Sequence, residues 1–361
     1  MQKLKMFRFL CLVLLFIPAM ALAAPAASDP AGGIMDFSEM DALIPDLMKQ
    51  SRVPGLSVAA FSRGTIVYAK GFGVKNRDTG AAVDPETVFE AASFSKPVTA
   101  YAALQMVERQ QLDLDRPLAQ YLKIPYLDDR PAAARITLRM ALNHTSGLPN
   151  DAVGYDRRVY FTPGDHFSYS GGGFRYLQAV MESVAKIPFA EYMDRELLQP
   201  LAMSRSSFTF RDDLAGNMAY GHQNDIAYPL RRTPALAAGS LLATPSDMAR
   251  FGMEFCKPTL LSVETTGLML TPSVKINELY SWGLGIGLCR TSAGDLAWQS
   301  GNNVIYQNFM VILPREQCGA VVMTNSSNGL QIAPYIAVSL LNRLLAKPIT
   351  NLDEIGKAYP L

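Results

Sequence analysis

The stretch that decides the fold is residues 87–97, which read Thr-Val-Phe-Glu-Ala-Ala-Ser-Phe-Ser-Lys-Pro. Its first three residues are β-branched or aromatic, which predicts a short β-strand. After Ser93 the period changes, and apolar side chains recur on one helical face at Val98, Tyr101, Leu104 and Val107. The chain is therefore expected to pass from a strand into an α-helix that begins at or near Ser93.

The expected helix start brings the side chains of Ser93 and Lys96 close together. Residues three apart on a helix share a face, so the Lys96 amine can reach the Ser93 hydroxyl. A serine hydroxyl is a weak nucleophile that needs a nearby base, and lysine serves only if its pKa falls from about 10.4 through burial or a second cation. The free N–H groups at a helix start can also stabilise an oxyanion. The pair therefore predicts a nucleophile and its base.

The same spacing of serine and lysine occurs at Ser183 and Lys186. Ser183 is expected inside a helix, where a hydroxyl usually bonds back to its own turn. Ser93 stands at a strand-to-helix junction, which favours it as the functional serine. The alternative for Ser93 is a plain helix cap.

Working outward, the hydrophobic pattern predicts an α+β fold. Arg63-Gly64 is a hairpin signal between two apolar runs. The expected strands are residues 56–62, 65–72, 282–289, 297–299, 306–313 and 320–324, and the expected helices are 37–49, 137–142, 174–186, 247–255 (capped by Ser246) and 332–345. One antiparallel sheet built from both ends of the chain, flanked by helices and with a mainly helical insertion, satisfies this order. We place the sheet part at about 35–92 and 256–350 and the insertion at about 93–255.

Composition narrows the function classes. The chain has 361 residues, 49% of them hydrophobic, which is enough to bury a large core. The formal net charge of +1, without a basic run, argues against nucleic-acid binding. Three histidines and no zinc-like cysteine spacing argue against a metal site, and no cofactor is expected. Cys256, Cys289 and Cys318 allow one disulfide at most.

The N-terminal segment has the pattern of a secretory signal peptide. A positively charged start precedes an apolar run over residues 9–19 and small residues at positions 21 and 23. A retained membrane anchor is the alternative, but the run is shorter than the ~20 residues of a spanning helix and Pro18 interrupts it. We expect residues 1–23 to be removed and residues 24–361 to be periplasmic or secreted, without membrane contact.

Four segments resemble motifs of the class C β-lactamase and penicillin-binding-protein superfamily of serine hydrolases. They are residues 87–97, residues 142–149 (Leu-Asn-His-Thr-Ser-Gly-Leu-Pro), residues 163–170 (Pro-Gly-Asp-His-Phe-Ser-Tyr-Ser), and residues 238–240 with 246–251. They come in the superfamily's order and extend from residue 87 to residue 251. The resemblance implies a β-lactamase/transpeptidase-like fold with an active site between its sheet and helical parts.

The resemblance gives Tyr169 the role of the second-motif tyrosine, which works with the lysine to accept the serine proton and pass it to the leaving group. The Lys96 cation would lower the Tyr169 pKa from about 10 towards the working range. The alternative is an ordinary buried tyrosine with a bonded hydroxyl. Tyr306 is a rival match to the tyrosine pattern, but it lies in an alternating strand and is expected in the core.

The third motif of the superfamily is lysine or histidine, a small residue and glycine, and its best match here is Gln299-Ser300-Gly301. Gly301 would keep the strand flat against a substrate. The resemblance implies that the N–H of Asn302 completes the oxyanion hole beside that of Ser93. The alternative for Gln299 is an exposed strand residue.

Two departures bear on the substrate. Gly171 stands where penicillin-recognising members usually have asparagine, and Gln299 is neutral where a lysine would pair with a β-lactam carboxylate. We therefore expect an esterase or D-amino-acid peptidase type of enzyme, acting through an acyl-enzyme on a small molecule or short peptide, with weak or no β-lactamase activity. The alternative is a catalytically silent binding module on the same fold.

A serine–histidine–acid triad is disfavoured because no Gly-x-Ser-x-Gly elbow occurs. His144 is expected to shape a helix end. His166 is a weaker candidate for the pocket wall, because lone histidines are often structural. The sequence predicts no oligomeric state.

Overall fold

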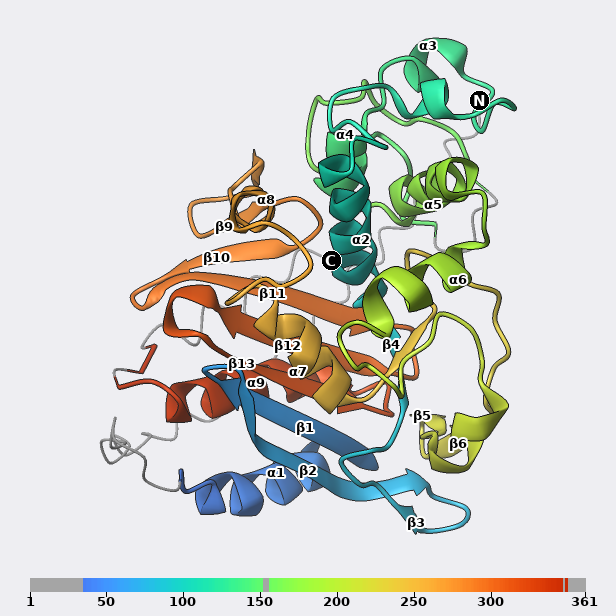
Figure 1. Cartoon of the computed structure of the whole chain (residues 1–361). Coiled ribbons are helices and arrows are strands. Elements are labelled where there is room, and N and C mark those ends of the chain that lie inside the picture. Colours follow the sequence, from blue (N-terminus) through green and yellow to red (C-terminus); the bar gives the residue numbers. More distant parts are fainter. Residues whose placement is uncertain (1–34, 152–155, 347, 350–361) are drawn as a thin grey trace, which may run out of the picture.

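The structure is a computed structural model that describes residues 35–151, 156–346 and 348–349 (Figure 1). The predicted signal peptide at 1–23 lies outside these residues. Helices pack against one large antiparallel sheet, which confirms the predicted α+β class. Within the described ranges, no helix is both long and apolar enough to cross a membrane.

Both ends of the chain contribute strands to this sheet. In the described residues its order is β3-β2-β1-β13-β12-β11-β10-β9-β8, and every neighbouring pair is antiparallel. The N-terminal strands are β1 (Gly55–Ser62), β2 (Thr65–Asn76) and β3 (Ala81–Ala82). The C-terminal strands are β8 (Val274–Lys275), β9 (Tyr280–Trp282), β10 (Gly287–Thr291), β11 (Gly294–Asn302), β12 (Gln307–Leu313) and β13 (Cys318–Thr324). The two sets meet where β1 pairs with β13.

Helices cover both faces of the sheet around β1. Ala59 and Phe61 point into the core that holds α7 (Pro245–Met253), whereas Leu56, Val58 and Ala60 point into the core that holds α1 (Ser38–Ser51) and α9 (Ala333–Arg343). Successive strand residues face opposite sides, so a strand covered on both faces reads as a continuous apolar run.

The middle of the chain forms the helical part, which lies above the sheet in Figure 1. Its helices are α2 (Ser95–Glu108), α3 (Arg130–Ala133), α4 (Leu138–Leu142), α5 (Gly171–Ala185) and α6 (Phe189–Met193), and α8 (Val263–Met269) follows later. Shorter helical turns are η1 (Leu118–Tyr121), η2 (Asp194–Leu198), η3 (Asp212–Asn217), η4 (Pro314–Glu316) and η5 (Gly329–Gln331). Two small antiparallel ribbons pair β4 (Phe89–Ala92) with β7 (Leu241–Ala243) and β5 (Gly221–Gln223) with β6 (Ile226–Tyr228).

Turn and cap chemistry explains several boundaries. Arg63 and Gly64 both have positive φ, at 49° and 79°, as the tight turn of a two-residue hairpin requires. Thr137 caps α4 by accepting a hydrogen bond from Met140 N, as predicted. These features confirm the hairpin and the helix that the sequence predicted.

Other predicted boundaries were wrong by a few residues. Helix α5 begins at Gly171 rather than residue 174, because the Ser170 side chain caps it by accepting from Gly173 N. Helix α7 is capped by Thr244 rather than Ser246, with a proline in the first helical position that proline favours.

The strand predictions also changed. The expected strand 282–289 is divided between β9 and β10, and Gly285 in the break has a φ of 88°. The short strand predicted at 87–89 lies further along the chain, as β4. It therefore ends directly before Ser93.

Candidate active site

Ser93 is delivered by a tight junction between β4 and α2. Ala92 has a φ of 53°, a left-handed conformation that costs an alanine roughly 1 kcal/mol. The Ser95 hydroxyl stabilises the turn, because it donates to Ala92 O at 2.6 Å and accepts from Leu241 N at 3.0 Å. Ser93 is half-buried and lies two residues before Ser95, the first residue of α2.

Lys96 lies in the first turn of α2 and is 2% exposed. Its Nζ donates to Ser93 Oγ at 3.0 Å and to Ala238 O at 2.8 Å, and it lies 4.7 Å from the centre of the Tyr169 ring. All three of these partners are neutral. No carboxylate lies among these contacts, so no ion pair holds the amine away from the serine.

Tyr169 is half-buried and connects Lys96 to the sheet. Its hydroxyl accepts a hydrogen bond from Gln299 Nε2 at 3.1 Å. Through its ring it contacts the Lys96 ammonium, in a geometry that attracts a cation to an aromatic face. Ser93, Lys96, Tyr169 and Gln299 thus form one chain of contacts, drawn from α2, the loop before α5, and β11.

Gln299 is fully buried, so the alternative of an exposed strand residue is wrong. Besides the Tyr169 hydroxyl, its Nε2 contacts Ser300 O at 2.8 Å. Its Oε1 has no hydrogen-bond partner within the described residues. Asn302, at the end of β11, is exposed, whereas Ser300 is buried.

Gly301 lets β11 approach β4 closely. A Cβ at this position would lie 2.4 Å from Ala91 O, which is too close for any side chain. Asn308 on the neighbouring strand β12 also joins the sheet to β4, because its Nδ2 donates a hydrogen bond to Glu90 O at 2.9 Å. The third-motif strand is therefore fixed beside the strand that delivers Ser93.

The carbonyls of residues 237–239 support the Lys96 side of the site. Ala238 O accepts from Lys96, Ala237 O accepts from Thr99 Oγ1 at 3.1 Å, and Gly239 O accepts from Asn303 Nδ2 at 3.3 Å. Three successive backbone carbonyls thus accept hydrogen bonds from side chains of α2 and of the loop after β11.

Glu90 joins this arrangement, although it was not among the predicted site residues. Its carboxylate pairs with the Arg231 guanidinium through both oxygens and accepts from Asn303 Nδ2 at 3.0 Å. The available signal was a single charged residue in an otherwise apolar strand, since charged residues are rarely buried without a partner.

The other candidate residues have structural surroundings. Tyr306 is buried and its hydroxyl donates to Ala219 O at 2.7 Å, which confirms the core prediction. The Ser183 hydroxyl donates to Tyr121 O at 2.8 Å rather than to its own turn, and Lys186 is exposed. His166 is exposed and its ring stacks on Phe161.

His144 follows the end of α4, where the sequence predicted it, but it also packs against Tyr169. The ring is fully buried, with its centre 4.3 Å from the centre of the Tyr169 ring. Burial and the Lys96 cation lower the His144 pKa well below its usual value of 6.5, so the imidazole is neutral.

The three cysteines predicted to allow one disulfide at most are all free thiols. Burial raises the pKa of Cys256 and Cys318 to about 12, which keeps both protonated and unreactive.

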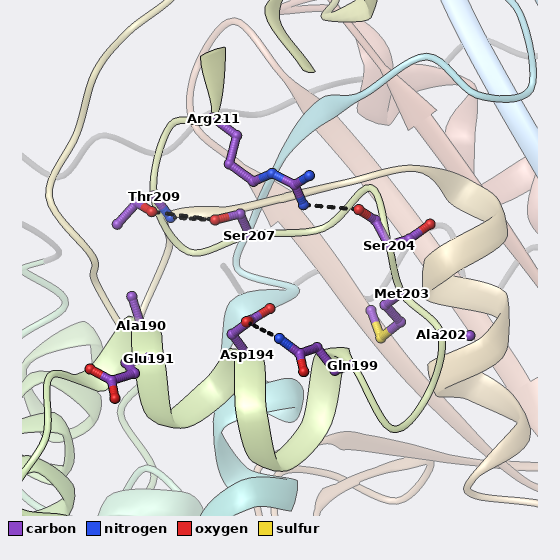
Figure 2. A pocket seen from close by; sticks show the side chains of 10 residues that line it. All are labelled: Ala190, Glu191, Asp194, Gln199, Ala202, Met203, Ser204, Ser207, Thr209 and Arg211. Atoms are coloured by element: carbon purple, nitrogen blue, oxygen red, sulfur yellow. Dashed lines mark hydrogen bonds between the residues drawn. The ribbon is translucent and has the colours of Figure 1, made fainter. Parts of the chain in front are cut away.

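A separate pocket of about 660 Å³ opens beside α6 and η2 (Figure 2). Its polar side chains are largely paired among themselves or with nearby backbone, as Gln199 with Asp194 and Arg211 with Ser204 O. No residue of the predicted catalytic group lines it. We therefore do not assign the chemistry to this pocket.

Comparison with known proteins decides the family. The family model described as Beta-lactamase matches residues 40–342. The chain belongs to the beta-lactamase family. Members of this family are generally serine hydrolases, and its relatives include penicillin-binding proteins, which confirms the resemblance seen in the sequence motifs.

One curated relative is "Protein flp" of Staphylococcus aureus (strain MRSA252). It is 22% identical to this chain over 314 residues, which are 80% of this chain and 62% of that protein. "Penicillin-binding protein 4" of Amycolatopsis lactamdurans is 26% identical over 229 residues, 57% of this chain and 60% of that protein. The chain thus spans about three fifths of the length of these relatives.

A solved structure, the octameric penicillin-binding protein homologue from Pyrococcus abyssi, matches with a TM-score of 0.76 and 28% identity. The match covers 87% of this chain and 78% of that one. It confirms the predicted fold. Together with the family match, it supports a serine hydrolase or penicillin-binding-protein-like function.

Proposed function

We propose that this protein is an exported serine hydrolase that cleaves an ester or amide through an acyl-enzyme on Ser93. The observation that carries the proposal is the 3.0 Å contact between Lys96 Nζ and Ser93 Oγ at the start of α2. The remaining Lys96 contacts are neutral, so the amine has no competing carboxylate among them. A serine with an adjacent base is the arrangement that nucleophilic catalysis requires.

In this mechanism the Lys96 ammonium first loses a proton to solvent; the Ser93 oxygen then attacks the substrate carbonyl, and the serine proton passes to the Lys96 amine. The N–H groups of Ser93 and Asn302 hold the oxyanion. Tyr169 relays the proton from Lys96 to the departing alcohol or amine as its bond to the carbonyl breaks. Water then attacks the acyl-enzyme, gives its proton back through the same groups, and releases the acid and free Ser93.

The neutral third motif supports an esterase or D-amino-acid peptidase type of substrate. Gln299 brings an amide to the position of the usual cation, and this amide already donates to the Tyr169 hydroxyl. A β-lactam carboxylate would find no cation at this position. The substrate class is therefore a small molecule or short peptide whose recognition does not depend on that carboxylate, and β-lactam hydrolysis is weak or absent.

Export is proposed from the N-terminal segment alone. A basic start, an apolar run and small residues at positions 21 and 23 fit a cleaved signal peptide, which would place residues 24–361 in the periplasm or outside the cell. The proposed chemistry needs no metal or cofactor, because the serine, its base and two backbone donors supply every step.

Kinetics on a substrate panel test the proposal. Aryl esters, D-amino-acid amides and a chromogenic cephalosporin are compared for the wild type, Lys96→Ala and the matched control Lys186→Ala. Lys186 has the same spacing from a serine but is exposed. We expect Lys96→Ala to lower kcat/KM about 10²–10⁴-fold, the usual contribution of general base catalysis, and Lys186→Ala to leave it unchanged.

A silent binding module is the second candidate, favoured by Gly171 and Gln299 at two motif positions. It predicts ligand binding without turnover across the panel, and no effect of Lys96→Ala on binding. Turnover that disappears in Lys96→Ala eliminates this candidate, whereas tight binding with no turnover in either protein eliminates the hydrolase.

A further inference from the structure

His144 bonds to the backbone on both sides of Tyr169. Its carbonyl oxygen accepts from Ser168 N at 2.8 Å, and its ring Nδ1 accepts from Ser170 N at 3.0 Å. The two peptide N–H groups that flank Tyr169 are therefore fixed by one residue, 25 positions earlier in the chain.

The imidazole also supports the Tyr169 ring directly. The two ring centres are 4.3 Å apart with the planes tilted by 37°. Trp282, Phe174 and Phe167 surround the imidazole at 5.0, 5.5 and 5.8 Å between ring centres. A close-packed aromatic group of this kind leaves the His144 ring little freedom to move.

The backbone conformation and the burial of His144 are both energetically unfavourable. His144 has a φ of 60°, a conformation that glycine or asparagine adopts more readily. Because Nδ1 accepts a hydrogen bond, the neutral ring carries its proton on Nε2. That buried N–H has no hydrogen-bond partner in the part of the chain that the structure describes. A residue needed only to end α4 would be replaced at lower cost by asparagine or glycine.

We propose that His144 is a positioning residue that holds the Tyr169 phenol in place between Lys96 and Gln299. It acts through Tyr169, and its role rests on the proposed function. Lys96, from α2, is the cation near the imidazole, and Tyr169 is the titratable neighbour whose tilted ring packs against it. The ring stays neutral, so it contributes geometry and no proton.

Two substitutions separate the backbone contact from the ring. His144→Asn places an acceptor oxygen at the position of Nδ1 and tolerates the positive φ. His144→Phe keeps a ring but leaves the Ser170 N–H unpaired. We expect His144→Phe to lower kcat about 100-fold with KM little changed, the size of effect that a 1 Å displacement of a catalytic group produces. His144→Asn should stay within about tenfold of the wild type.

Controls distinguish positioning from general stability. His222→Phe makes the same change at another buried histidine, and its kcat should equal that of the wild type when both are assayed below their unfolding temperatures. In a Tyr169→Phe background, the further change His144→Phe should lower kcat no more, because its effect passes through the missing hydroxyl. If His144→Phe does not fold, His144→Gly, which suits this φ and lacks both ring and acceptor, takes its place.

The outcomes separate this inference from the function it rests on. A wild type that neither turns over esters nor is labelled at Ser93 overturns the proposed function and the inference together. With an active wild type, the inference alone is overturned if folded His144→Phe keeps the wild-type kcat, or if His144→Asn falls as far as His144→Phe. A shift in the acidic limb of the pH–rate profile in His144→Asn would also overturn it, because that would make His144 a proton carrier.

Discussion

Replacing Gly301 by alanine tests the close approach of β11 to the strand that delivers Ser93. The new Cβ would lie 2.4 Å from Ala91 O and 3.0 Å from Asn308 Nδ2. Neither neighbour can withdraw easily, because the first is backbone and the second is hydrogen-bonded to Glu90 O. Ordinary contact begins near 3.4 Å, so the two strands must separate by about 1 Å.

A separation of this size predicts two effects. Displacing a catalytic element by about 1 Å costs about 10²-fold in rate, so kcat should fall by that factor. Forcing an extra methyl group into a packed interior typically destabilises by about 1–3 kcal/mol. Turnover of the best ester substrate and urea unfolding, measured on the same preparation, report the two effects separately.

Gly267→Ala is the matched control. Gly267 lies on the exposed face of α8, and a methyl group added there would meet no atom within 4 Å. The same substitution should therefore stabilise the helix by about 0.5–1 kcal/mol and leave kcat unchanged. If Gly301→Ala has wild-type stability and wild-type kcat, the close approach of β11 to β4 has no part in the site.

Three further outcomes follow from individual contacts. The pKa of His144 is lower in the folded chain than in the unfolded chain, so below pH 6.5 the unfolded chain binds a proton that the folded chain does not. The free energy of unfolding should therefore fall by up to about 1.4 kcal/mol for each unit that the pH is lowered from 6.5 to 5. Urea titrations should show a shallower fall in His144→Asn, and equal slopes contradict this. Gln299→Lys adds a cation and replaces the amide that donates to the Tyr169 hydroxyl, so ester turnover should slow about tenfold while a carboxylate-bearing cephalosporin competes more strongly. An unchanged inhibition constant counts against this role. Tyr101→Phe removes a 2.6 Å hydrogen bond to the buried Glu254 carboxylate and should cost about 1.5–3 kcal/mol in urea unfolding, whereas a loss below 0.5 kcal/mol would show that Glu254 finds another partner.

Local sequence signals predicted the contacts made within one hairpin or one helical turn. Arg63-Gly64 indicated the β1–β2 hairpin because its turn needs two positive φ angles, which the structure has. Helix periodicity placed Lys96 within reach of Ser93, and the two atoms lie 3.0 Å apart. In both cases the geometry depends on fewer than five consecutive residues.

Contacts between distant segments could not be predicted in the same way. The hydrogen bond from Gln299 to the Tyr169 hydroxyl joins residues 130 positions apart, and spacing carries no information about it. The burial of Gln299 could not be predicted from the sequence pattern either, because strands of a sheet covered on both faces do not alternate apolar and polar residues. The sequence places His144 at a helix end but cannot predict its ring contacts, because these depend on how the helical part packs.

The most direct test of the central claim locates the nucleophile chemically. The wild-type protein is treated with a serine-directed phosphonate, its intact mass is measured, and the labelled peptide is sequenced by mass spectrometry beside Ser93→Ala. The proposed mechanism predicts a single adduct on Ser93 that is absent from Ser93→Ala and forms slowly in Lys96→Ala. An adduct on another residue, or a wild type labelled no faster than Ser93→Ala, would contradict it.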